Sequence, residues 1–254
     1  MTSWTDRIVL VTGASAGFGH AIAKAYAALG ARLILSGRRQ DRLEALQAEL
    51  AVPSRLLVLD VRDRHAVETA IAALPADFAA IDVLVNNAGL ALGVAPAHQA
   101  NLDDWETMID TNVKGLMYMT HAVLPAMVAR DRGHVVNISS VAGTYPYPGG
   151  NIYGASKAAV TQFSLNLLAD LVKTRVRVTN IEPGLCGGSE FSLVRYKGDA
   201  EAAAKVYAGT TSLSAQDVAE AVVWATTLPA HVNINRIEMM PISQAPGGPV
   251  VYRS

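Results

Sequence analysis

Residues 8–19 read Ile-Val-Leu-Val-Thr-Gly-Ala-Ser-Ala-Gly-Phe-Gly, so that an apolar run passes directly into a glycine-rich turn. A segment long enough for a helix follows at 20–29. Three glycines in the turn allow the backbone to bend tightly and to approach a pyrophosphate, whose negative charge the N-terminus of a helix stabilises. The stretch therefore predicts a dinucleotide-binding turn formed by Gly13, Ser15, Gly17, Phe18 and Gly19.

The alternation of apolar runs and helix-length segments continues to the end of the chain. Seven strand-like runs are rich in apolar residues, at 8–12, 32–36, 55–59, 83–86, 134–138, 176–181 and 236–240. Most of them are hydrophobic without strict alternation, which is typical of parallel strands buried on both faces. The segments between them are long enough for crossover helices. The pattern predicts an α/β fold: one doubly wound Rossmann domain over 1–254, with a mainly parallel sheet of about seven strands and helices on both faces. Ligands are expected at the carboxyl ends of the strands.

Composition limits the partners of this chain. Of its 254 residues 51% are hydrophobic, and the formal net charge of -1 gives no basic excess for nucleic-acid binding. The single cysteine, Cys186, excludes an intrachain disulfide, and the histidines show no metal-binding spacing. The sequence has no secretory signal and no apolar run of about 18 residues that could span a membrane. We expect a cytoplasmic protein with small-molecule partners and no metal.

The end of the second predicted strand distinguishes between the two nicotinamide dinucleotides. NAD sites usually place a carboxylate here, which binds the ribose hydroxyls. This chain instead has Arg38 and Arg39, and its next acidic residue is Asp41. Two guanidinium groups suit a 2′-phosphate, so we expect NADP(H). The alternative interpretation is a solvated loop with two arginines.

Residues after the third and fourth predicted strands complete the expected cofactor site. Asp60 and Val61 are expected to border the adenine pocket, and Asn87, Ala88 and Gly89 to lie under the cofactor. Asp60 can also cap the helix that follows, and the two roles are compatible.

Three polar residues in the second half of the chain indicate acid–base chemistry. Tyr153 precedes Lys157 by four residues within an expected helix at 151–172, so the two side chains share one face. A cation about 5 Å away, at an effective dielectric of about 20, lowers the pKa of a tyrosine by roughly two units. Such a phenol is a suitable general acid or base. Ser140 lies thirteen residues before Tyr153. An ordinary exposed tyrosine and lysine are the alternative, which the nucleotide-binding pattern disfavours.

Together these motifs resemble the short-chain dehydrogenase/reductase family over essentially the whole chain. The matching segments are Thr12-Gly13-x-x-x-Gly17-x-Gly19, Asn86-Asn87-Ala88-Gly89, Asn112, Ser139-Ser140, Tyr153-Gly-Ala-Ser-Lys157 and Pro183-Gly184. The resemblance implies that Tyr153 donates and accepts the proton, that Ser140 holds the substrate oxygen, and that Lys157 also binds the nicotinamide ribose. It further implies a proton relay through Asn112, a nicotinamide site at Pro183 and Gly184, and a homotetramer.

Further segments resemble one branch of that family, at 108–112, 182–185, 190–192, 194–195, 197–199 and 228–235. They are similar to NADP-dependent 3-hydroxy acid dehydrogenases, which act on serine, allo-threonine or 3-hydroxyisobutyrate, or reduce malonic semialdehyde. Sulfoacetaldehyde reductases are a sister group with many of the same segments. The chain departs from both groups at 186–189 and in a Pro/Gly-rich tail at 245–254.

The segment 186–211 is the expected substrate lid, with Gly187 and Gly188 as a hinge. A small anion needs a compensating cation once water is excluded, so Arg195, with Tyr147, is expected to bind a carboxylate or sulfonate. The alternative is that Arg195 is a solvated lid residue. Cys186 has no basic neighbour in the sequence, so we expect it to pack beside the pocket rather than act as a nucleophile.

The expected activity is the NADP(H)-dependent interconversion of small 3-hydroxy acids, of the serine, allo-threonine or 3-hydroxypropionate type, and their carbonyl forms. A sulfoacetaldehyde reductase and a broad-specificity carbonyl reductase are the alternatives. A cofactor-binding protein without catalytic activity is disfavoured, because Ser140, Tyr153 and Lys157 are all present.

Overall fold

A seven-stranded sheet forms the centre of the computed structural model, which describes residues 4–247. Every neighbouring pair of strands is parallel, in the order β3-β2-β1-β4-β5-β6-β7. The strands are β1 Ile8–Thr12, β2 Arg32–Gly37, β3 Ser54–Val58, β4 Val83–Asn86, β5 Gly133–Ile138, β6 Val176–Pro183 and β7 Arg236–Met239. The prediction of a doubly wound Rossmann fold is confirmed, with a sheet that is parallel throughout.

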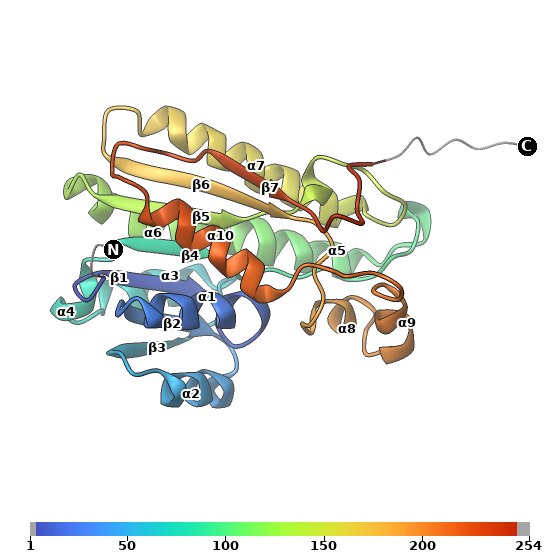
Figure 1. The fold of residues 1–254 in the computed structure, drawn as a ribbon, viewed down its shortest axis with the longest axis horizontal. Coiled ribbons are helices and arrows are strands. Elements are labelled where there is room, and N and C mark those ends of the chain that lie inside the picture. Colours follow the sequence, from blue (N-terminus) through green and yellow to red (C-terminus); the bar gives the residue numbers. More distant parts are fainter. Residues whose placement is uncertain (1–3, 248–254) are drawn as a thin grey trace, which may run out of the picture.

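Helices cover both faces of this sheet (Figure 1). The α-helices are α1 Gly17–Ala28, α2 Gln40–Glu49, α3 Arg64–Ala72, α4 Ala76–Ala79, α5 Leu102–Ile109, α6 Leu116–Ala129, α7 Asn151–Asp170, α8 Phe191–Arg195, α9 Ala200–Lys205 and α10 Ala215–Thr227. Short 3-10 turns lie at Ala97–Gln99 and Val141–Gly143, and a π-helical stretch, Asp110–Gly115, joins α5 to α6.

Alternate residues of the central strands enter two separate cores. In β1, Val9 and Val11 pack into the core formed with α1, α2 and α10, whereas Leu10 packs into the core formed with α3, α6 and α7. Side chains of a strand point alternately to the two faces of its sheet, so a strand covered on both faces must be apolar throughout. The edge strands β3 and β7 are only partly buried, because the helices cover the edges of the sheet incompletely.

The strand order reverses between β1 and β4, which are neighbours in the sheet although β2 follows β1 in the chain. The loops after these two strands leave in opposite directions and open a crevice at their carboxyl ends. The lid helices α8 and α9 lie beyond the same ends (Figure 1). Within residues 4–247, no helix has both the length and the apolar character needed to cross a membrane.

Candidate active site and cofactor pocket

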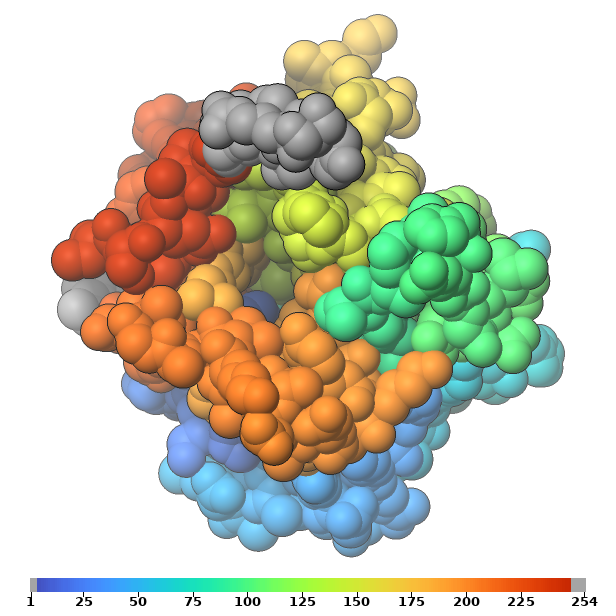
Figure 2. Space-filling model, turned by 90° about the vertical axis from the view of Figure 1, so that its right-hand side faces the viewer, coloured from blue at the N-terminus to red at the C-terminus, as the bar shows by residue number. Residues whose placement is uncertain are grey.

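A pocket of about 840 Å³ opens at the carboxyl ends of the strands. Figure 2 shows this end of the molecule, with a hollow between the lid in orange and the segment before residue 247 in red. The pocket is lined by the glycine-rich turn and by the loops after β2, β3, β4, β5 and β6. The structure brings every predicted site residue to its wall except Gly19 and Asn112, which lie behind it.

The glycine-rich turn is built for close backbone approach. Gly13 has a φ of 65°, a left-handed conformation that favours glycine. A Cβ at Gly19 would overlap the carbonyl oxygen of Gly13 and lie 2.6 Å from Asn87 Nδ2. Asn87 Nδ2 donates to the carbonyl of Thr12 at 2.9 Å, which ties the loop after β4 to the end of β1. The turn is therefore fixed by the loop that follows β4.

The N-terminus of α1 faces this pocket and suits a pyrophosphate. Its N-cap, Ala16, offers no side-chain hydrogen bond, and no acidic residue lies in the first turn of the helix. The amide donors of this first turn thus have no capping side chain, which matches a phosphate ligand that binds to backbone N–H groups. Gly13 and Gly17 both line the pocket beside this helix N-terminus, so the residues present fit a dinucleotide.

The two predicted phosphate-binding arginines differ in their surroundings. Arg38 is largely exposed, and its Nη1 lies 3.9 Å from Asp60 Oδ2. Arg39 is held on two sides: its Nη1 donates to Glu190 Oε2 at 2.8 Å, and its Nε and Nη2 donate to Ser15 Oγ at 3.3 and 3.2 Å. Arg39 is thus the better-positioned of the two guanidinium groups for a ligand beside the glycine-rich turn.

Asp60 and Val61 border the pocket where predicted, after β3. Asp60 accepts hydrogen bonds from the side chain and backbone of Arg62. The helix cap is Asp63, whose side chain accepts from Ala66 N at 3.0 Å. The alternative role of Asp60 as the cap of α3 is therefore wrong, because the helix begins one turn later than that interpretation required.

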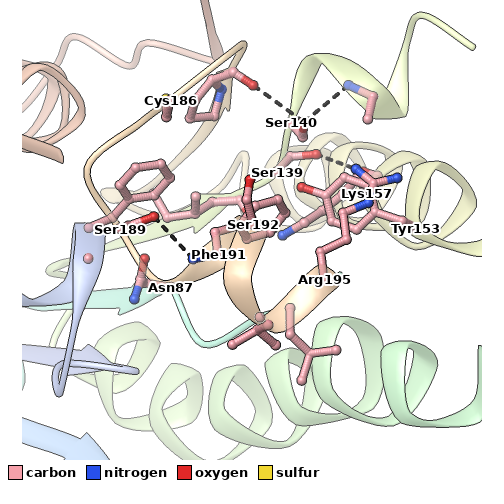
Figure 3. Close-up of a pocket in the computed structure, with 18 of the residues that line it drawn as sticks. Asn87, Ser139, Ser140, Tyr153, Lys157, Cys186, Ser189, Phe191, Ser192 and Arg195 are labelled. Atoms are coloured by element: carbon pink, nitrogen blue, oxygen red, sulfur yellow. Dashed lines mark hydrogen bonds between the residues drawn. The ribbon is translucent and has the colours of Figure 1, made fainter. Parts of the chain in front are cut away.

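Ser140, Tyr153 and Lys157 converge at the inner end of the pocket (Figure 3). Ser140 follows β5; its Oγ donates to the carbonyl of Pro183 at 3.3 Å and accepts from Ala142 N at 3.1 Å. Lys157 Nζ lies 5.9 Å from the centre of the Tyr153 ring and donates to the carbonyl of Ile138 at 2.9 Å. One face of α7 and the end of β5 thus supply all three groups.

Burial, rather than Lys157, controls the protonation of Tyr153. Burial raises the pKa of Tyr153 to about 12, while a hydrogen bond with Ser140 and the charge of Arg195 lower it only in part. Burial also lowers the pKa of Lys157 to about 8. The prediction from the sequence that the pKa of the Tyr153 phenol is lowered was wrong for the protein without a ligand. That prediction counted the charge of the Lys157 ammonium group but not the loss of solvent around the two side chains.

Asn112 lies in the π-helical stretch and is 1% exposed. Its Oδ1 accepts from Leu90 N at 2.9 Å, and its Nδ2 donates to Leu90 O at 2.9 Å and to Ser156 Oγ at 3.0 Å. The side chain therefore fixes the loop after β4 to the catalytic helix α7. Local π-helical turns are frequent at functional sites.

Arg195 and Tyr147 meet at the outer end of the pocket. The guanidinium carbon of Arg195 lies 5.3 Å from the centre of the Tyr147 ring and 5.6 Å from that of Tyr153. Arg195 donates to two neutral carbonyl groups, those of Gly93 at 3.2 Å and Gly149 at 3.4 Å. Within residues 4–247 it forms no ion pair, so its charge is available to an anion.

Cys186 lines the same pocket, and burial raises the pKa of its thiol to about 12. A protonated thiol is a poor nucleophile, which agrees with its expected packing role.

Several pocket residues could not be found from the sequence pattern. Phe191 lies with its ring centre 5.8 Å from that of Tyr153. Gln244, after β7, accepts from Leu185 N at 2.7 Å. Glu190 bonds to Arg39, 151 residues away. These contacts join distant segments, and no local spacing signals them. The Pro/Gly-rich tail at 245–254, where the sequence departs from both related groups of enzymes, is described only in part, because residues 248–254 lie outside the described part of the chain.

The family model for short chain dehydrogenases matches residues 7–194, and the chain belongs to this family. The resemblance of the sequence motifs is thereby confirmed.

Two curated proteins and a solved structure give a finer comparison. An NADP-dependent 3-hydroxy acid dehydrogenase of Salmonella typhi is 61% identical over 247 residues, which cover 97% of this chain and 100% of the relative. A serine 3-dehydrogenase of Agrobacterium fabrum is 50% identical over 245 residues, covering 96% and 98%. The closed form of serine dehydrogenase complexed with NADP+ matches with a TM-score of 0.94 and 59% identity, covering 97% of this chain and all of that one.

Proposed function

We propose that this protein is an NADP(H)-dependent dehydrogenase that interconverts small 3-hydroxy acids and their carbonyl forms. One observation carries the proposal: a single pocket is lined both by Arg39 with the glycine-rich turn and by Ser140, Tyr153 and Arg195. The names of the relatives, an NADP-dependent 3-hydroxy acid dehydrogenase and a serine 3-dehydrogenase, support it.

The pocket residues at the carboxyl ends of β1, β2, β3, β4 and β6 would hold NADP(H). The N-terminus of α1 would hold its pyrophosphate, and Arg39 and Arg38 would hold its 2′-phosphate. Asp60 and Val61 would border its adenine, and the segment 87–89 would lie beneath it. Pro183 and Gly184 would adjoin its nicotinamide, and Lys157 would bind the ribose. NADP(H) supplies or accepts the hydride.

Tyr153 moves the proton in this reaction. In reduction its hydroxyl protonates the carbonyl oxygen; in oxidation it removes the proton from the alcohol. Ser140 donates a hydrogen bond to the same oxygen and thereby orients the substrate. Burial raises the pKa of Tyr153, and a hydrogen bond with Ser140 together with the charge of Arg195 offsets part of that rise. Asn112 fixes the surrounding segments and supports the proton relay to solvent.

Arg195 binds the acidic group of the substrate. Its guanidinium group lies over the rings of both Tyr153 and Tyr147, so an anion bound there is close to the proton-transfer site. A carboxylate is the expected group, and a sulfonate, as in sulfoacetaldehyde, is the alternative because both accept paired hydrogen bonds. We further propose a cytoplasmic homotetramer whose segment 186–211 acts as the substrate lid.

The test compares malonic semialdehyde, sulfoacetaldehyde and an uncharged aldehyde in NADPH oxidation by the wild type and by Arg195→Ala. Loss of a charge-assisted bond should raise KM for the preferred anion about ten- to hundredfold and leave the uncharged aldehyde unchanged. Lys205→Ala, which removes an exposed cation of the same lid, is the matched control. Equal kcat/KM for charged and uncharged aldehydes in the wild type would instead indicate a general carbonyl reductase.

A further inference from the structure

Glu190 connects the lid to the arginines that follow β2. Its Oε2 accepts from Arg39 Nη1 and its Oε1 from Arg42 Nη1, both at 2.8 Å. Arg39 is the N-cap residue of α2 and Arg42 lies in its first turn, whereas Glu190 is the N-cap residue of α8. One carboxylate thus fixes the start of the lid helix to the body of the protein.

The lid helix α8 carries this attachment to the active site. It contains only five residues, and its last, Arg195, lies over the ring of Tyr153. The carbonyl of Arg195 also accepts from Gly93 N at 2.9 Å. A helix this short moves as one body, so a displacement of Glu190 also displaces Arg195.

A hinge precedes this attachment. Gly188 has a φ of 71°, and among the described residues no atom outside Gly188 and its two chain neighbours lies within 4 Å of the position of a Cβ there. The preceding residue is anchored, because Gly187 N donates to Leu213 O at 2.8 Å. The backbone can therefore rotate between a fixed base and Glu190, and the ion pairs with Arg39 and Arg42 limit that rotation.

Arg39 presents separate edges to Glu190 and to the pocket. Nη1 bonds to Glu190, while Nε and Nη2 share one hydroxyl oxygen, Ser15 Oγ, at 3.3 and 3.2 Å. An edge with two donors binds two oxygens of a phosphate better than one hydroxyl. Under the function proposed above, a 2′-phosphate takes this edge and Glu190 keeps Nη1.

Phosphate binding should strengthen the lid attachment. The ion pairs of Glu190 are about 40% exposed, and such pairs are weak because ordering the side chains opposes them. A phosphate that already orders Arg39 removes part of this entropic cost. The positive charges of Arg39 and Arg42 offset the repulsion between the phosphate and the carboxylate.

We propose that Glu190 is a positioning residue that couples the 2′-phosphate of the bound cofactor to lid closure, and thereby to the placement of Arg195 at the substrate. The coupling rests on the proposed function, because it requires Arg39 to bind the phosphate. Its consequence is that the substrate binds more tightly in the presence of NADPH than of NADH.

The kinetic test uses Glu190→Gln, which keeps the size of the side chain and removes its charge. In the wild type, KM for the preferred anionic aldehyde should be about three- to tenfold lower with NADPH than with NADH, as expected for a coupling through half-exposed ion pairs. In Glu190→Gln the two KM values should become equal while kcat with NADPH is retained. Glu201→Gln, which removes an exposed lid carboxylate paired with Lys205, should behave as the wild type.

A second measurement does not depend on turnover. Hydrogen exchange of the amides of residues 190–205 should be slower with saturating NADP+ than with saturating NAD+ in the wild type and in Glu201→Gln. In Glu190→Gln the two cofactors should protect these amides equally. A role of Glu190 in lid stability alone would change exchange by the same factor with both cofactors, and that result would overturn the coupling.

Two arginine variants separate the failure of this coupling from failure of the proposed phosphate site. Arg39→Ala should weaken NADPH binding in a fluorescence titration, whereas Arg42→Ala should keep NADPH affinity and lose the NADP+-specific protection of the lid. Unchanged NADPH affinity in Arg39→Ala would refute the phosphate site and the coupling with it. Weakened affinity in Arg39→Ala, together with full NADP+-specific protection in Glu190→Gln, would refute the coupling alone.

Discussion

Replacement of the buried Lys157 by methionine should change how the stability of the protein depends on pH. Lys157 is 6% exposed, and burial lowers the pKa of its ammonium group from 10.5 to about 8. Its ammonium group donates to the carbonyl of Ile138 at 2.9 Å. The folded protein therefore holds this proton less tightly than the unfolded chain does.

The difference between the folded and the unfolded pKa of Lys157 sets how the free energy of unfolding changes with pH. Between the folded pKa of about 8 and the unfolded value of 10.5, the unfolded chain binds more protons, so the free energy of unfolding rises with pH. The full difference between the two pKa values corresponds to roughly 3 kcal/mol, of which about 2 kcal/mol is recovered between pH 7 and pH 9.5. Tyr153 acts in the opposite direction only above pH 10, because its folded pKa of about 12 exceeds its ordinary value of 10.0.

The assay is urea denaturation of wild type and Lys157→Met at these two pH values, at one fixed protein concentration. The stability of Lys157→Met relative to the wild type should fall by about 2 kcal/mol between pH 7 and pH 9.5. Lys173→Met, at an exposed lysine, controls for the loss of a positive charge. A relative stability of Lys157→Met that is the same at both pH values would refute the assignment of a buried, shifted lysine.

Three further changes test other parts of the structure. Tyr153→Phe should lower kcat by at least about 100-fold with no change in NADPH affinity measured by fluorescence titration; retained turnover would exclude Tyr153 as the proton donor. Gly19→Ala places a Cβ 2.6 Å from Asn87 Nδ2 and against the carbonyl of Gly13. The affinity for NADPH, measured by the same titration, should therefore fall by at least about tenfold. Unchanged affinity would show that the glycine-rich turn adapts to the added methyl group. Leu35→Ala, at a fully buried strand residue, should lower the free energy of unfolding by about 2–5 kcal/mol in urea denaturation; a loss below this range would mean that the core closes around the gap.

Local sequence patterns were sufficient to predict the layout of the fold. The apolar runs located all seven strands to within about two residues. The glycines at 13, 17 and 19 located the passage from β1 into α1, although the helix begins at Gly17, three residues before the expected segment 20–29. The expected helix at 151–172 corresponds to α7, Asn151–Asp170. Strand and helix periodicities are properties of neighbouring residues, so the spacing of Tyr153 and Lys157 also placed both side chains on one face of α7.

Only the tertiary structure decided the contacts and energies between distant segments. It placed Glu190 on Arg39, Gln244 on Leu185 N and Asn112 between Leu90 and Ser156. It also raised the pKa of Tyr153, which the sequence had predicted to be lowered, because burial depends on every element that surrounds the phenol. The chain by itself determined which residues form each strand, helix and turn, since those preferences are local. Which side chains meet in the pocket, and how far water is excluded from them, was decided by the packing of the lid and strand ends around it.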